Sequence, residues 1–320
     1  MERTKGKISD QVKAHANKRP EESKEYEGSA EQVVTTGSTL LDLAILGGRV
    51  QGGGVPLGIM VEIFGPSGTG KTTLLCEIAG AVQRKDGEVL FNDPEGRLNK
   101  EFAEIFDFDV SASTLETPDT VPEVFQPIRK WEPKSDGPHA VFADSLAALS
   151  TQAELDDNDA YGMRRAKEFS EECRKTCRIL SQNNWLLVCS NQVRININAG
   201  SFQEKYQSPG GEAIPFYSSL RLKTKNLGKI TREKTVKGKK VSRVIGVETE
   251  VSVYKSSVWK PYRSASVPII FDYGIDDIRA NLQFAKQFGD KSVYGVRDQK
   301  LDNSMDEAIR KVEENGLEEE

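Results

Sequence analysis

Short apolar segments alternate with helical patterns through the first two thirds of the chain. Four of them are GIMVEIF (58–64), EVLFND (88–93), HAVFAD (139–144) and WLLVCSN (185–191). Turn-forming or charged residues bound these segments, and longer stretches with helical spacing of apolar residues separate them. Strands that alternate with helices are typical of βαβ units. The pattern predicts an α/β fold built on a doubly wound, mainly parallel sheet.

The pattern changes after residue 217. Apolar and polar residues alternate in 218–227, 243–256 and 264–274, which predicts an antiparallel extension of the sheet. Between the first two of these runs lies GKITREKTVKGKK (228–240), which holds six Lys or Arg residues and has Gly238 as a turn former. We interpret this segment as the tip of a basic hairpin.

The two ends of the chain lack the pattern of the middle. Residues 1–31 are polar and have no apolar stripe at helical spacing, so we interpret them as an arm or linker. The core is expected to span 32–273. The remaining residues, 274–320, are predicted to be a short helical region with an acidic tail. Their last part, MDEAIRKVEENGLEEE (305–320), is too small for a core of its own.

Composition limits the classes of partner and compartment. The 320 residues carry a net charge of −5, so any nucleic acid has to be held by a local basic surface. The four cysteines form no CxxC pair and the chain has only two histidines, which favours reduced thiols over a zinc site. No apolar run approaches the roughly 20 residues of a membrane span. We expect a cytoplasmic protein without a membrane partner.

The segment GPSGTGKT (65–72) is a complete GxxxxGK[ST] pattern between a predicted strand and a predicted helix. In such a loop, backbone N–H groups and the positive end of the helix dipole surround a β-phosphate. Lys71 then reaches the β- and γ-phosphate oxygens, and the Thr72 hydroxyl ligates Mg²⁺. The residues predicted to bind the nucleotide here are Gly65, Pro66, Ser67, Gly68, Thr69, Gly70, Lys71, Thr72 and Thr73.

Two carboxylates lie at the ends of successive predicted strands. Asp144 ends the run AVFADS, at the carboxyl end of a core strand where open α/β sheets bind ligands, and we expect it to hold the Mg²⁺ shell. FNDPEG offers Asp93 and Glu95 at the end of the strand that follows the loop helix. Transfer of a phosphoryl group to water needs a group that orients the water, and Glu95 is our candidate for it. The alternative is a solvated turn carboxylate.

The segments TTGSTLLDLAIL, VEIFGPSGTGKTTL, FNDPEG, ADSLAALSTQAEL, SNQVR and PGGEAIPFYSSLRL, in this order, resemble the RecA family of recombinases. The resemblance covers roughly residues 33–273. It implies a RecA-like P-loop NTPase core that uses ATP and Mg²⁺ and assembles into filaments. It also implies that Asp119 lies beside the adenine, that Gln192 senses the γ-phosphate, and that Lys255 reaches the active site of a neighbouring protomer.

The family further implies two DNA-binding loops, here about 154–167 and 193–211. In and after the first loop, Arg164, Arg165, Lys167 and Arg174 are candidate phosphate contacts, although a solvated helix start is the alternative. In the second loop, Arg194 is a candidate phosphate contact and Ile197 a candidate wedge between bases. Gly210 and Gly211 close this loop with backbone freedom.

Two positions depart from the family. Ser257 and Pro215 stand where bacterial members have basic interface residues, which puts the strength of coupling between protomers in doubt. The basic hairpin is longer than in those members, and we expect it to contact duplex DNA, with a merely solvated turn as the alternative.

These features predict a DNA-dependent ATPase that forms filaments on single-stranded DNA and promotes strand exchange with duplex DNA in recombination and repair. Two alternatives remain. One is a RecA-like paralogue or single-strand-binding ATPase that modulates recombination without strand exchange. The other is a different P-loop motor or phosphotransferase, since the phosphate loop alone serves all of these classes.

Overall fold

The computed structural model describes residues 32–50, 52–150, 163–195, 206–207, 212–289 and 292–318. The predicted arm, 1–31, lies outside them. Among the described residues, no helix combines the length and the apolar character that crossing a membrane requires.

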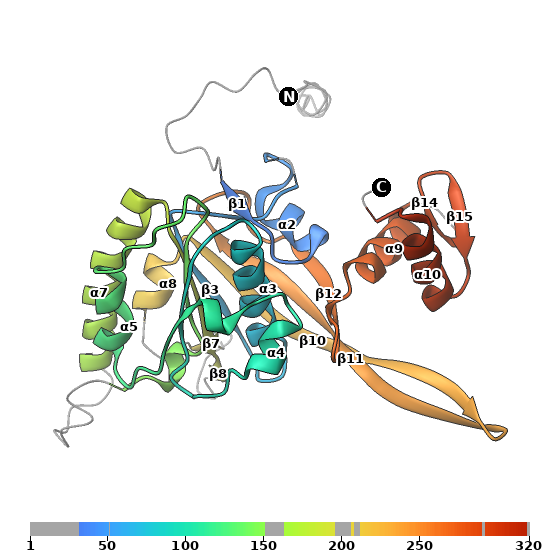
Figure 1. Cartoon of the computed structure of the whole chain (residues 1–320), viewed down its shortest axis with the longest axis horizontal. Helices are drawn as coiled ribbons and strands as arrows, with labels where there is room; N and C mark the ends of the chain where they lie inside the picture. The colour runs from blue at the N-terminus through green and yellow to red at the C-terminus, as the bar shows by residue number, and fades with distance from the viewer. Residues whose placement is uncertain are drawn as a thin grey trace, which may run out of the picture. The chain divides into compact units, whose positions relative to one another are not determined.

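A nine-stranded sheet forms the centre of the described part of the chain (Figure 1). Its strands, in spatial order, are β13 (Gly274–Ile275), β12 (Ser264–Ile270), β11 (Lys239–Ser256), β10 (Leu220–Val236), β3 (Met60–Gly65), β7 (Leu186–Gln192), β6 (Ala140–Ala143), β4 (Val89–Asn92) and β5 (Thr114–Glu116). The strands from β10 to β5 pair in parallel, whereas β10 to β13 pair antiparallel. The predicted parallel core with an antiparallel extension is confirmed.

Two hydrophobic clusters fill the two faces of this sheet. Successive side chains of a strand point to opposite faces, so Val61 and Ile63 enter one cluster while Met60 enters the other. The first cluster includes α2 (Thr39–Leu46) and α3 (Lys71–Gln83). The second includes α5 (Val121–Ile128), α7 (Met163–Asn183) and α8 (Ala213–Tyr217). Burial on both faces explains why the central strands read as continuous apolar runs.

Shorter elements complete the region. They are β1 (Val33–Val34), β2 (Val55–Pro56), α4 (Lys100–Glu104), and two 3₁₀ turns, Val110–Ala112 and Leu146–Ala148. A two-stranded ladder, β8 (Arg194–Ile195) with β9 (Tyr206–Gln207), lies within the predicted second DNA loop.

The predicted hairpin is present, and its strands continue through most of the segment that was interpreted as its tip. Strands β10 and β11 continue their ladder to the pair Val236–Lys239, and Lys237 and Gly238 turn the chain with positive φ angles of 48° and 76°. The segments Thr231–Val236 and Lys239–Val244 extend beyond the residues that pair with β3 and β12 (Figure 1).

A small α/β group follows the sheet. It contains α9 (Asp277–Phe288), β14 (Tyr294–Val296), β15 (Gln299–Asp302) and α10 (Met305–Asn315). Leu282, Leu301, Ala308 and Val312 form a buried cluster between these elements. A short helical region was predicted here; the two strands were not, and both helices share the buried cluster with them.

Candidate nucleotide-binding site

The loop between β3 and α3 has the geometry that a phosphate loop requires. Gly68 and Gly70 have φ angles of 72° and 74°, in the left-handed region that favours glycine. A Cβ atom on Gly65 would lie 2.1 Å from the Thr224 hydroxyl oxygen of β10, so only glycine fits there. Pro66, Ser67 and Gly68 are exposed, whereas Thr69 and Thr73 are buried. The start of α3 therefore presents an accessible backbone to a ligand.

Lys71 is folded into this loop. Its Nζ atom donates to the carbonyl oxygens of Pro66 at 2.8 Å and Gly65 at 3.2 Å. Burial lowers the pKa of the Lys71 ammonium group, and the carboxylates of Asp144 and Glu95 oppose that shift. An ammonium group so placed gains charge-assisted hydrogen bonds when a phosphate enters the loop.

Asp144 and Thr72 meet at the carboxyl end of β6. The Thr72 hydroxyl donates to Asp144 Oδ2 at 2.5 Å, and the Ser190 hydroxyl donates to Asp144 Oδ1. The described residues contain no group of three or more His, Cys, Asp or Glu side chains suited to a metal ion. A hydroxyl and one carboxylate nevertheless fit Mg²⁺, which takes one or two protein ligands and completes its shell with phosphates and water.

Glu95 lies in the turn after β4, and its side chain is 19% exposed. The Ser145 hydroxyl donates to Glu95 Oε1 at 3.0 Å, and Arg97 forms an ion pair with Oε2 at 2.7 Å. Ser145, Arg97 and Ser190 are site residues that the sequence analysis missed. Ser145 follows Asp144 directly in the sequence, and Ser190 lies in a predicted strand. These positions were the available signal.

The parallel register places Gln192 beside the phosphate loop. In the β3–β7 ladder, Gly65 pairs with Gln192 and Phe64 with Asn191. Val188 of the same strand faces the α3 side, and residues two and four positions further along share that direction. Gln192 therefore lies on the same face of the sheet as α3, at the point where β7 enters the segment predicted to bind DNA.

Two predicted nucleotide contacts lie elsewhere. Asp119 is exposed between β5 and α5, where its backbone N–H donates to Glu123 Oε2 at 2.8 Å. Lys255 lies on β11, and its Nζ atom donates to the carbonyl oxygens of Pro215 at 2.8 Å and Phe216 at 2.9 Å. Burial, with the nearby Arg221 charge, lowers the pKa of Lys255. The Phe216 side chain beside it is 73% exposed.

The predicted DNA contacts are described only in part. Lys167 and Arg174 are exposed on α7. Arg165 differs from the expectation of an available cation, because its Nη2 atom donates to the carbonyl oxygens of Leu146 at 3.2 Å and Ala147 at 3.0 Å. The side chains of Arg164 and Arg194, and the whole of Ile197, Gly210 and Gly211, lie outside the described residues.

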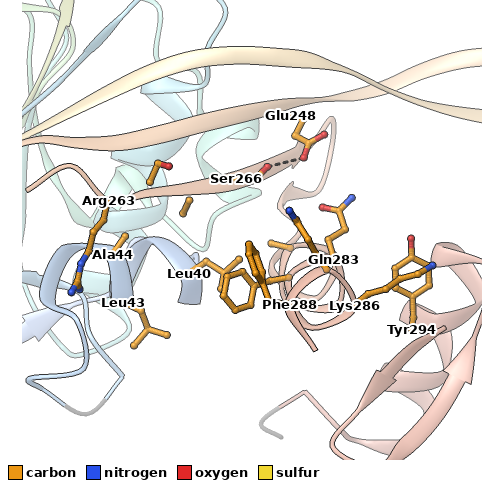
Figure 2. A pocket seen from close by; sticks show the side chains of 15 residues that line it. Leu40, Leu43, Ala44, Glu248, Arg263, Ser266, Gln283, Lys286, Phe288 and Tyr294 are labelled. Carbon is orange, nitrogen blue, oxygen red and sulfur yellow. Dashed lines mark hydrogen bonds between the residues drawn. The ribbon is translucent and has the colours of Figure 1, made fainter. Parts of the chain in front are cut away.

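A cavity of about 890 Å³ lies away from this site (Figure 2). Leu40 and Leu43 of α2 line it on one side and Phe284 and Phe288 of α9 on the other. Its lining residues include neither the phosphate loop nor Asp144 and Glu95. The cavity is therefore not part of the candidate nucleotide site.

Comparison with known proteins agrees with this geometry. Residues 22–276 match the family model described as the RecA N-terminal domain. The chain is 31% identical over 290 residues to Protein RecA of Borrelia hermsii (strain HS1 / DAH), covering 88% of this chain and 77% of that protein. It is 31% identical over 290 residues to Protein RecA of Laribacter hongkongensis, covering 89% and 78%. It is 32% identical over 265 residues to Protein RecA of Thioalkalivibrio sulfidiphilus, covering 82% and 73%.

Proposed function

The chain belongs to the RecA family of recombinases, and from that premise we propose that it is a DNA-dependent ATPase that forms helical filaments on single-stranded DNA and pairs that DNA with homologous duplex. The observation that carries the proposal is the pairing of Gly65 with Gln192. It joins the phosphate loop directly to the strand that leads into the second predicted DNA loop.

In the proposed reaction, the loop backbone and Lys71 bind the phosphates of ATP, and Thr72 and Asp144 hold Mg²⁺. The metal ion neutralises charge that develops on the phosphate oxygens. Glu95 orients the attacking water and accepts its proton. The Ser145 hydrogen bond to Glu95 Oε1 supports this role because it holds the carboxylate in one orientation. Asp119 contacts the adenine, and Lys255 contacts the nucleotide of a neighbouring protomer.

DNA binding is proposed to follow from the state of Gln192. An uncharged amide hydrogen-bonds the γ-phosphate and releases it after hydrolysis, so the loop behind the amide orders and relaxes with the nucleotide. Arg194, Ile197, Gly210 and Gly211 act in that loop. Arg164 and Lys167 contact phosphates from the start of α7, and Arg174 does so from further along the same helix. Arg165 joins them only after releasing its two carbonyl partners. The basic hairpin contacts duplex DNA.

The decisive measurement is the rate of ATP hydrolysis with and without single-stranded DNA, followed by electron microscopy for filaments. We expect turnover to rise on adding single-stranded DNA and filaments to form in the presence of ATP. Turnover that is insensitive to DNA, with no filaments, would instead indicate a different P-loop enzyme and defeat the proposal.

One observation favours a second candidate, a RecA-like ATPase that binds single-stranded DNA and modulates recombination without strand exchange. Lys255 is occupied by carbonyl oxygens of its own chain, and Ser257 and Pro215 supply no second cation. A strand-exchange assay beside the ATPase assay separates the two: DNA-stimulated turnover without exchange identifies this second candidate.

A further inference from the structure

A buried charged cluster lies on the sheet face opposite the nucleotide. Glu62 of β3 is 0% exposed and Arg221 of β10 is 7% exposed. Arg221 Nε donates to Glu62 Oε2 at 2.6 Å, and Asn191 Nδ2 donates to Glu62 Oε1 at 3.0 Å. Each carboxylate oxygen therefore has its own partner on a neighbouring strand. We call these three residues, Glu62, Asn191 and Arg221, the Glu62 cluster.

The cluster is held in one geometry by aromatic rings. The Arg221 guanidinium carbon lies 4.5 Å from the centre of the Phe64 ring and 5.3 Å from that of Tyr254. These two rings contact each other edge to face at 5.4 Å. A planar guanidinium between two rings and a carboxylate has little freedom to move.

Stability alone does not account for such a cluster. Two buried charges lose their hydration, and well-packed apolar side chains of similar volume are often equally stable in their place. Polar groups that satisfy one another in a core do fix the relative positions of the elements that carry them. The strands that the cluster joins therefore indicate its role.

The three strands joined by the cluster carry the proposed catalytic and interface positions. Asn191 precedes Gln192 on β7, and Glu62 lies three residues before Gly65 on β3. Arg221 pairs across the β10–β11 ladder with Lys255. Neighbouring residues of a strand face opposite sides of the sheet. The cluster therefore contacts these strands on one face, while Gln192 lies on the other face, toward the phosphate loop.

We propose that the Glu62 cluster is a positioning device that holds Gln192 against the phosphate loop and keeps Lys255 in register with it. The inference rests on the proposed function and deepens it: a displacement of the β7 end on nucleotide binding reaches Lys255 through Asn191, Glu62 and Arg221. Glu62, Asn191 and Arg221 touch no substrate. They act through Gln192 and Lys255.

The test uses full-length variants that leave no buried charge unpaired. Glu62→Leu combined with Arg221→Met removes both charges together, and Asn191→Leu removes only the link to β7. With single-stranded DNA and ATP, we expect kcat to fall roughly tenfold in each case, because small misplacements of a catalytic group have effects of this size or larger. The KM for ATP is expected to change by less than about twofold, since the phosphate loop is untouched.

A matched control is available in a second ion pair. Arg129 Nη1 lies 2.5 Å from Glu172 Oε2, where it joins the end of α5 to α7 on the same side of the sheet. Arg129→Met combined with Glu172→Leu removes a comparable pair without touching β3, β7 or β10. We expect its kcat and KM to match the wild-type values.

A folded Glu62→Leu/Arg221→Met variant with wild-type kcat overturns the inference, as does an equal loss in the control. If the double variant does not fold, Asn191→Leu, which retains the ion pair, decides by the same criterion. If wild-type turnover does not rise with DNA, the proposed function fails instead. The inference is then judged on basal kcat, which the same variants must lower at unchanged KM.

Discussion

The nucleotide region and the β10–β11 hairpin use charge in opposite ways. Around the phosphate loop, Lys71, Asp144 and Glu95 are each held by hydrogen bonds of 3.2 Å or less. Along the outer hairpin, the cations are exposed and their ion pairs are long: Arg232 to Asp306 at 3.6 Å and Lys240 to Glu233 at 3.8 Å. The first region is preorganised for one ligand geometry, and the second provides a field that salt screens.

The largest effect on the nucleotide region is expected from replacing Lys71. We expect Lys71→Ala to abolish ATP turnover, a loss of roughly a thousandfold or more, because no other described cation reaches the loop carbonyls that Lys71 occupies. Steady-state ATPase measurements with and without DNA check this. Turnover close to wild type would show that the loop does not bind the reacting phosphates.

Glu95 separates chemistry from binding. Glu95→Gln retains an oxygen that accepts from Ser145 but cannot take a proton, so kcat is expected to fall roughly a hundredfold or more while ATP affinity is kept. Binding of a fluorescent ATP analogue measures affinity beside the turnover assay. The carboxylate is only structural if kcat stays within a fewfold of the wild-type value.

Glu77 lies on α3, and its burial raises the cost of carrying a charge there. Burial raises the pKa of Glu77 from 4.5 to about 7, opposed by the hydrogen bond from the Ile275 N–H and by the Arg84 charge, while Asp107 and Asp277 raise it further. Between pH 4.5 and 7 the folded state binds more protons than the unfolded state, so wild-type stability falls as the pH rises through this window.

The Glu77→Gln variant keeps an acceptor for the Ile275 N–H and has no charge. Its free energy of unfolding at pH 8 is expected to exceed that of the wild type by up to about 3 kcal/mol. The difference should vanish below pH 4.5. Urea unfolding at pH 4, 6 and 8 measures it, and a difference independent of pH would contradict the assignment.

The smallest effect is expected at the hairpin tip. Lys237, Lys239 and Lys240 are exposed, so changing all three to Ala should leave ATP turnover intact and weaken only duplex capture. Each lost phosphate contact lowers the salt slope of duplex binding by about one unit. A control variant removes the same charge at three other exposed positions, Lys100, Lys130 and Lys134. Equal salt slopes in the two variants would refute a specific role for the hairpin.

The same two regions explain what the sequence allowed us to predict. The parallel strands are buried on both faces, so their apolar runs were visible, and the phosphate loop is a local pattern with fixed spacing. Residues 228–240 were interpreted as a hairpin tip rather than as strands because they are exposed and charged, which leaves no apolar alternation to follow. Strands β14 and β15 are too short for a periodic signal.

The Glu62 cluster was not predictable for a different reason. Glu62 interrupts an apolar run, and its partner Arg221 lies 159 residues further along the chain. Their pairing depends on β10 joining β3 in parallel, with Arg221 opposite Glu62. Only tertiary structure supplies that register. The position of Gln192 beside Gly65 depends in the same way on the order of strands in the sheet.

The outer hairpin also exposes the long sides of two strands. In the described pairings, Thr231–Val236 and Lys239–Val244 pair only with each other, so their outward N–H and C=O groups are available to another strand. Such edges promote association between copies unless charged side chains oppose it. We expect Lys234, Lys237, Lys239 and Lys240 to repel the same segment of a second molecule. The lysines would then oppose edge-to-edge aggregation independently of any DNA.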